Sequence, residues 1–223
     1  SQLTALVFLK FPPSNGFLFH QLIIRISFYN VIINVLFNQY TLLVEFHFII
    51  IMKKIVIYVS DHGFGHAART IALVRQLKKY HYEIIIKNLN AYTFLKSQLP
   101  ECEIIKIRTD VGPITDVFSD SPNYEKTFSL YHNWINNSKK WLDKETKFFK
   151  NRTIDLIISD ISPISIRLAN KLQIPSITVA NFTWIDILEE FPFYKNCDKI
   201  IDWLHESFEM TDLAIRVPLH MKL

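Results

Sequence analysis

Glycine is scarce in this sequence, and its placement is uneven. Only four of the 223 residues are glycine, and two of them, Gly63 and Gly65, lie within the stretch Asp61-His-Gly-Phe-Gly-His66. Glycine permits a positive φ and allows a bound group to approach the backbone closely. We therefore expect this stretch to be a turn whose shape or openness depends on glycine.

Cysteine is also scarce, which excludes a disulfide-rich secreted scaffold. Cys102 and Cys197 are the only cysteines, and they lie far apart without the close spacing of metal ligands. Two reduced thiols are what a cytosolic protein normally carries. The sequence thus predicts a cytoplasmic protein without a metal site.

Neither sign of charge dominates, and no large basic cluster occurs. Lysine and arginine number 25 against 21 acidic residues, which gives a formal net charge of +4. Basic residues gather only in pairs such as Lys78-Lys79 and Lys139-Lys140, which is typical of solvated helix faces. A nucleic-acid partner is therefore not expected.

Long uninterrupted apolar runs are missing as well, although residues 1–51 are rich in Phe, Ile and Leu. A membrane span needs about 20 continuous apolar residues, and Arg25, Glu45 and several asparagines interrupt every such window. A signal peptide would be shorter and would have a basic start and a small-residue cleavage site. The segment meets neither description.

We expect residues 1–51 to be a non-native or disordered apolar extension. The segment begins at Ser1, lacks helical or alternating periodicity, and has the composition of translated A+T-rich DNA. Met52, followed by lysines and a strand-like run, has the form of an ordinary start. A membrane-associated extension is the alternative, which leaves peripheral membrane contact open. The predicted folded domain comprises residues 52–223.

From residue 52 onward, short apolar runs alternate with amphipathic stretches. This alternation is typical of βαβ units, so we predict an α/β fold: a Rossmann-like parallel sheet with helices on both faces. A long loop is expected at residues 108–126. The predicted strands are residues 55–59, 83–87, 103–107, 155–159 and 175–179, and the predicted helices are residues 67–79, 91–98, 128–150, 164–172 and most of the tail from 185.

Polar residues follow each predicted strand. In a sheet of this kind, ligands bind at the carboxyl ends of the strands, so these residues should meet at one rim. They are Ser60-Asp61-His62, Lys87-Asn88, Arg108-Thr109-Asp110, Ser159-Asp160 and Asn181-Phe-Thr-Trp184.

The glycine stretch also matches a dinucleotide fingerprint in part. Gly63-Phe-Gly65-His-Ala-Ala68 has the form G-x-G-x-x-A. The fingerprint requires an acid about 20 residues on, at the end of the second strand, to bind a ribose. Lys87-Asn88 occupies that place. A nicotinamide or flavin cofactor is therefore disfavoured.

His62 and His66 flank the glycines and are the candidate general bases. The start of the following helix offers unpaired N–H groups and a positive dipole end, which favour an anion. The same dipole disfavours an imidazolium and so keeps a neutral imidazole available. The alternative for each histidine is packing with a structural hydrogen bond.

Three further residues have both a functional and a structural interpretation. Asp160 could orient a histidine or a substrate hydroxyl, or cap the next helix. Arg69 could pair with a phosphate or carboxylate of the substrate, or form a surface salt bridge. Trp184 could be an aromatic platform or a packing residue.

Three motifs in order carry a resemblance to a known family. They are Asp61-His-Gly-Phe-Gly-His-Ala-Ala-Arg69, Asp155-Leu-Ile-Ile-Ser-Asp160 with Pro163, and Pro175-Ser-Ile-Thr-Val-Ala-Asn-Phe-Thr-Trp184. Residues 52–223 resemble the N-terminal, acceptor-side half of GT-B glycosyltransferases. The resemblance is to the group that includes the lipid-II-forming N-acetylglucosaminyltransferase and the glycosyltransferase-like region of L-arabinokinase.

The resemblance implies transfer of a hexosyl group from a nucleotide-sugar to a sugar or lipid-linked acceptor. The nucleotide-sugar is a co-substrate, and no other cofactor is implied. Gly63, Gly65 and His66 would form the turn that faces the donor, while Asp160, Asn181 and Trp184 would line the cleft. One departure is that Ile185 follows the last aromatic residue where the family often has an acid, and the acid here is Asp186.

The resemblance also implies a second Rossmann-like domain that holds the nucleotide. The sequence stops at Leu223, near the expected linker. We therefore expect the nucleotide domain to lie downstream or on a partner chain, and this chain to be incomplete alone. The alternative is a non-catalytic module of the same fold that binds a sugar or a nucleotide.

Overall fold

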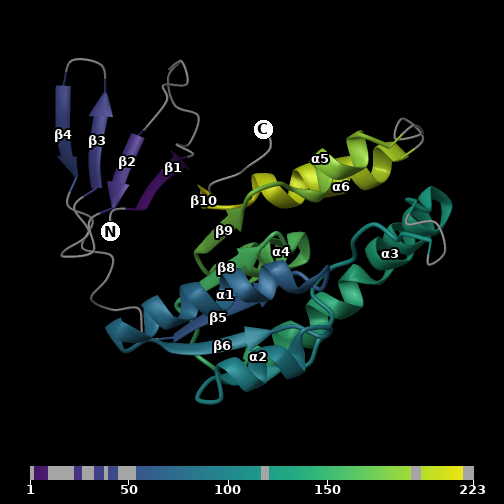
Figure 1. Cartoon of the computed structure of the whole chain (residues 1–223), viewed down its shortest axis with the longest axis horizontal. Helices are drawn as coiled ribbons and strands as arrows, with labels where there is room; N and C mark the ends of the chain where they lie inside the picture. Colours follow the sequence, from purple (N-terminus) through teal and green to yellow (C-terminus); the bar gives the residue numbers. More distant parts are fainter. Residues whose placement is uncertain are drawn as a thin grey trace.

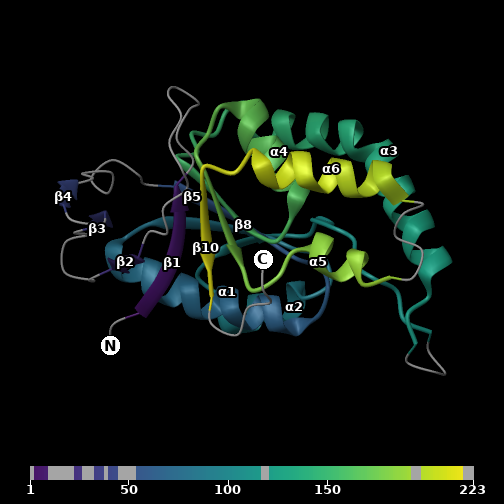
Figure 2. The same cartoon turned by 90° about the horizontal axis from the view of Figure 1, so that it is seen from above.

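A parallel β-sheet with helices on both faces organises the chain (Figures 1 and 2). The structure is a computed structural model, and it describes residues 3–9, 23–26, 33–37, 40–44, 54–116, 121–191 and 197–217. Within these residues, no helix has both the length and the apolar character needed to cross a bilayer.

The strands from β5 to β10 all run parallel, in the spatial order β7-β6-β5-β8-β9-β10. This is the Rossmann order, in which the first strand lies between the second and the fourth. The bounds are β5 Lys54–Val59, β6 Glu83–Lys87, β7 Glu103–Ile105, β8 Leu156–Asp160, β9 Ser176–Ala180 and β10 Leu213–Arg216.

Strands from the N-terminal segment extend this sheet at its β10 edge. Strand β1 (Leu3–Leu9) pairs antiparallel with β10, and β2 (Ile23–Ile26) pairs antiparallel with β1. Strands β3 (Ile33–Phe37) and β4 (Tyr40–Val44) form a separate antiparallel pair. Strand formation does not distinguish natural from non-native sequence, and much of the segment lies outside the described residues. The prediction for residues 1–51 therefore stays a prediction.

The helices cover the two faces unequally. Helices α1 and α2 lie on one face, and α3, α4 and α6 lie on the other (Figure 2). The bounds are α1 Phe64–Leu77, followed by the short 3₁₀ helix η1 Lys78–Tyr80, then α2 Tyr92–Gln98, α3 Tyr124–Phe149, α4 Pro163–Leu172, α5 Trp184–Glu189 and α6 Asp198–Glu209.

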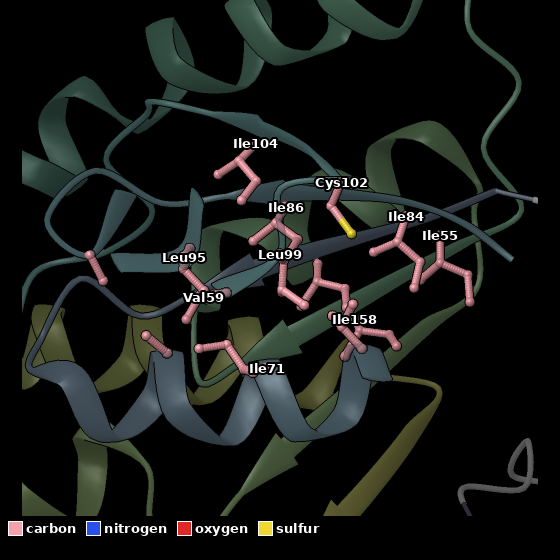
Figure 3. Packing of buried hydrophobic residues seen from close by; sticks show 14 of the residues in the cluster. Ile55, Val59, Ile71, Ile84, Ile86, Leu95, Leu99, Cys102, Ile104 and Ile158 are labelled. Carbon is pink, nitrogen blue, oxygen red and sulfur yellow. The ribbon is translucent and has the colours of Figure 1, made fainter. Parts of the chain in front are cut away.

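Alternation along the central strand explains why both faces are apolar. Ile55, Ile57 and Val59 pack under α1 and α2, whereas Val56 and Tyr58 pack on the side of α3 and α4. Figure 3 shows the first of these layers, in which isoleucine and leucine side chains from strands and helices interdigitate. Each buried aliphatic side chain contributes about 1.5–3 kcal/mol. Burial on both sides is the reason the strand is a continuous apolar run.

The predicted strands are confirmed, with boundaries shifted by no more than a few residues. Helix α1 begins earlier than predicted, at Phe64, so that Gly65 and His66 lie in its first turn. Helix α3 also begins earlier, because the Asn123 side chain caps it by accepting a hydrogen bond from the backbone N–H of Lys126 at 3.0 Å. Strand β10 was not predicted; its residues were included in the tail from 185, which was expected to be mostly helical.

Candidate functional site

The polar ends of the strands meet at one rim of the sheet, as predicted. Asp61, after β5, accepts hydrogen bonds from the backbone N–H of Leu89 at 2.7 Å and from that of Thr109 at 2.8 Å. Asn88, after β6, donates through its side chain to the carbonyl oxygen of Ser60 at 3.1 Å. These bonds hold together the loops that follow β5, β6 and β7.

Lys87 does not reach this rim, so its predicted place there was wrong. Its side chain is buried on the opposite face of the sheet, where Nζ lies 2.8 Å from Oε2 of Glu145 and 3.5 Å from the ring centre of Phe148. The alternation of side chains along β6 sends Lys87 under α3 and leaves Asn88 at the rim.

The glycine stretch contains one conformation that requires glycine. Gly63 has φ 82° and ψ 165°, and it precedes the first residue of α1. Gly65 lies inside the helix, and its φ is not positive. A Cβ atom added at either position would meet no heavy atom within 4 Å. The space beside Gly65 is therefore open, and the protein itself does not require glycine there.

His66 and Asp160 form a buried pair at this rim. Nδ1 of His66 lies 2.8 Å from Oδ1 of Asp160, which is 3% exposed. Because a carboxylate can only accept, this contact assigns a proton to Nδ1 and leaves Nε2 as the basic nitrogen, although Nη2 of Arg69, which can only donate, also lies 3.1 Å from Nδ1. The pair forms because β5 and β8 are neighbours in the sheet, which places the start of α1 beside the end of β8.

Arg69 completes this cluster from the same helix. Its guanidinium forms an ion pair with Asp160, and its Nη1 donates to Oδ1 of Asn181 at 2.9 Å. Asn181 follows β9, so the cluster joins three neighbouring strand ends. Of the alternatives for Arg69, the structure favours the salt bridge, which is largely shielded from solvent. Contact of Arg69 or Asn181 with a substrate stays a prediction.

His62 lies beside this cluster, between an aromatic ring and a glycine. Its imidazole packs edge-on against the indole of Trp184, with ring centres 5.2 Å apart. Gly112 also lies close to this ring, since an added Cβ there would be 2.5 Å from Nδ1 of His62. Partial burial, and then the charge of His66, lower the pKa of His62. Its imidazole is therefore neutral at pH 7.

The indole of Trp184 packs near both histidines. It is 1% exposed, and its Nε1 donates to Oδ2 of Asp110 at 3.0 Å. Its ring centre lies 6.4 Å from that of His66, and Phe182 packs against both rings. The structure thus gives Trp184 the packing role.

Sequence reasoning placed Asp110 among the polar strand ends at the rim but gave it no role, and it missed Gly112. Both lie in the loop after β7, within the long loop predicted at residues 108–126. The available signal was a glycine, Gly112, close to a strand end in a chain with only four glycines. Within the described part of the chain, no group of three or more His, Cys, Asp or Glu side chains is placed to hold a metal ion.

A family model matches this same region of the chain. Residues 53–199 match the sequences described as glycosyl transferase family 1. The chain belongs to glycosyl transferase family 1. The predicted resemblance to glycosyltransferases is thereby confirmed, and the rim described above is the candidate site of a family 1 member.

Among proteins similar to this family 1 member is the L-arabinokinase of Arabidopsis thaliana, 26% identical over 169 residues that make up 72% of this chain and 16% of the relative. Among solved structures, the glycotransferase of kitacinnamycin has a TM-score of 0.46 and 14% identity, over 70% of this chain and 41% of that one. MurG of Acinetobacter baumannii has a TM-score of 0.45 and 12% identity, over 77% and 43%. The chain thus spans less than half of each of these proteins.

Proposed function

We propose that this chain is the acceptor-side domain of a glycosyltransferase that moves a hexosyl group from a nucleotide-sugar to an acceptor hydroxyl. A second domain, downstream or on a partner chain, would supply the contacts to the base and ribose of the donor. The observation that carries the proposal is the buried pair of His66, in the first turn of α1, and Asp160, at the end of β8. It stands at the strand ends where this fold binds ligands.

The chemistry assigned to the pair is general base catalysis. The acceptor hydroxyl loses its proton as its oxygen bonds to the anomeric carbon, and the nucleoside diphosphate leaves with the electron pair of the bond that breaks. Nε2 of His66 would take that proton. Asp160 holds the Nδ1 proton and stabilises the imidazolium that forms. Phe182 and Trp184 pack against the imidazole and keep water away from it.

The donor diphosphate would lie at the start of α1. The first N–H groups of a helix have no partner within the helix, and the dipole favours an anion there. The open space beside Gly65 would let phosphate oxygens approach the backbone. Cys102 and Cys197 are both buried and free, which supports the proposed cytoplasmic location.

The test of this proposal is His66→Ala in a version of the protein that includes a second domain. Loss of a general base lowers kcat by about 10²–10⁴-fold. Release of nucleoside diphosphate from a UDP-hexose, in the presence of acceptor, measures the rate. His205→Ala is the matched control, because His205 is an exposed histidine on α6, away from the rim. Full turnover by the His66→Ala variant would overturn the catalytic assignment.

The alternative is a non-catalytic module that binds a sugar or a nucleotide. The Arg69–Asp160 ion pair favours it, because a carboxylate already balanced by a cation does less to stabilise an imidazolium. Calorimetric titration with UDP-hexose distinguishes the two functions. Binding that His66→Ala leaves intact, together with no turnover by the completed protein, would support the module.

A further inference from the structure

Asp110 is a buried carboxylate at the rim that the proposed chemistry does not use. It follows β7 and is 2% exposed. Each of its oxygens accepts a different hydrogen bond: Oδ1 from the backbone N–H of Asp61 at 2.8 Å, and Oδ2 from Nε1 of Trp184 at 3.0 Å. A buried carboxylate with a donor on each oxygen is a bridge between the two elements that carry the donors.

Both of these elements, the backbone at Asp61 and the indole of Trp184, restrict the position of His62. Asp61 directly precedes His62 in the chain, so the first hydrogen bond holds the backbone that carries the imidazole. The second holds the indole whose ring meets that imidazole edge-on at 5.2 Å. The loop that carries Asp110 also carries Gly112, where an added Cβ would lie only 2.5 Å from Nδ1 of His62. The His62 ring is thus confined by contacts that depend on this loop.

We propose that Asp110 is a positioning residue for His62, fixing at once its backbone and the indole against which it packs. The inference rests on the proposed function only in taking this rim as the ligand site. At this rim, Asp110 fixes the position of His62 beside the His66–Asp160 pair. His62 then presents a neutral imidazole to the acceptor or donor.

The surroundings of Asp110 allow its carboxylate to be ionised at neutral pH. Burial, and more weakly the charge of Asp61, raise the pKa of Asp110 to about 6, while hydrogen bonds from Ser60, Asp61 and Trp184 oppose the rise. Tyr131 of α3 faces it as well, since the charge of Asp110 contributes to the raised pKa of that phenol. At pH 7.5 the carboxylate is ionised, and each of its oxygens can accept.

The substitution Asp110→Asn tests the bridge with almost no change of shape. Asparagine has only one acceptor oxygen, so its NH₂ group must face one of the two N–H donors. The full chain, labelled for NMR, reports the pKa of His62 and the indole N–H signal of Trp184. We expect the pKa of His62 to rise toward 6.5, its ordinary value, because the released ring gains solvent.

Two further variants complete the experiment. Asp116→Asn is the control, because Asp116 lies in the same loop but its carboxylate accepts from the Asn123 side chain at 3.0 Å. Trp184→Phe removes the indole donor, so the asparagine amide no longer faces it. The effects of Asp110→Asn and Trp184→Phe on the pKa of His62 should therefore be non-additive, as expected for residues in contact.

The outcomes separate this inference from the proposed function, since none of these signals requires a sugar or turnover. A folded Asp110→Asn variant with an unchanged pKa of His62 would overturn the positioning role, even if the indole signal moved. If Asp110→Asn does not fold, the Trp184→Phe variant alone tests the positioning role. That variant leaves the carboxylate in place and should still raise the pKa of His62, and an unchanged value would again overturn the proposal.

Discussion

At the scale of single residues, the site depends on which atom of each side chain is already engaged. Nδ1 of His66 is held by Asp160, and the guanidinium of Arg69 is held by Asp160 and Asn181. The nitrogen left with basic character is Nε2 of His66. Residue identity alone allowed Arg69 to be the ligand contact, and only the geometry shows that its charge is already paired.

Asp160→Asn should disable the base while leaving the imidazole in place. The asparagine oxygen could still accept from Nδ1, but its NH₂ group would face Arg69 and the charge opposite the imidazolium would be lost. We expect kcat of a two-domain version to fall by about 10²–10⁴-fold. Nitrogen NMR of His66 would report the tautomer directly. Wild-type turnover with a mixed tautomer population would contradict the assignment.

The two glycines before and within α1 should respond in opposite ways to alanine. At Gly65 the added Cβ meets nothing, so alanine should stabilise the helix by about 0.5–1 kcal/mol. At Gly63 alanine would have to adopt φ 82°, at a cost of about 1–3 kcal/mol. Urea unfolding of both variants measures these effects.

The Gly65→Ala variant also tests whether Gly65 faces the donor. If phosphate oxygens approach the backbone there, Gly65→Ala should weaken UDP binding although it stabilises the fold. Calorimetric titration of the two-domain version gives the affinity. A more stable Gly65→Ala variant that binds UDP as well as the wild type would show that the open space serves no ligand.

At the scale of elements, most strands and helices could be predicted because their residues are buried in a regular pattern. Strand β5 is apolar and buried from Ile55 to Val59, since both of its faces are covered. The start of α1 could not be placed, because glycine is read as a helix breaker, and a helix tolerates Gly65 in its first turn. Strand β10 was not predicted because its residues are only half-buried, so they lack the apolar signal of a central strand.

Helix α3 is joined to the sheet by a buried charge pair that polar patterning did not reveal. Glu145 accepts from Nζ of Lys87 at 2.8 Å and from the hydroxyl of Tyr58. Burial lowers the pKa of Lys87 and the charge of Glu145 opposes that shift, so the pair holds a cation that would otherwise be costly to bury. The aromatic rings of Tyr58, Phe148 and Phe149 lie around the ammonium group of Lys87 and also cover this charge.

Glu145→Gln should therefore be strongly destabilising. It would leave Lys87 buried without its counter-charge, and breaking a buried pair from one side costs about 3–5 kcal/mol. Lys87→Met in the same chain should recover much of that loss, because the methionine carries no charge. Urea unfolding measures both variants. A loss below about 1 kcal/mol for Glu145→Gln would mean that the lysine gives up its proton instead.

At the scale of the whole molecule, the order of the strands decides which distant residues share a site. The motif after β5, the acid after β8 and the asparagine after β9 are far apart in sequence, yet the Rossmann order places their strands side by side. This convergence could be predicted, because it follows from topology. The hydrogen bonds of Asp110 could not, because a loop between a strand and a helix has no periodicity from which to derive its contacts.

Asp110 also links the rim to the stability of the whole fold. Its pKa is about 6 in the folded protein and about 3.9 in an unfolded chain, so the folded state binds this proton more tightly. The stability that this proton contributes is fully present below about pH 4 and is lost as the pH rises through 6. The stability therefore depends on pH in the opposite direction to that given by a salt-bridged carboxylate. The difference corresponds to about 3 kcal/mol at most.

Comparison with Asp110→Asn tests this contribution, because asparagine does not titrate. Urea unfolding at pH 4.5 and pH 7 gives the free energy of unfolding of each. The advantage of the wild type over the variant should shrink as the pH rises, while the unfavourable contact of the asparagine amide adds a constant offset. His62, whose pKa is lowered, changes stability in the opposite direction, and Asp110→Asn is expected to raise that pKa. Its contribution is therefore calculated from the pKa of His62 measured by NMR in each protein and subtracted first. A difference that is the same at both pH values would mean that Asp110 titrates as it does in an unfolded chain, and that the bridge at the rim is not buried as the structure places it.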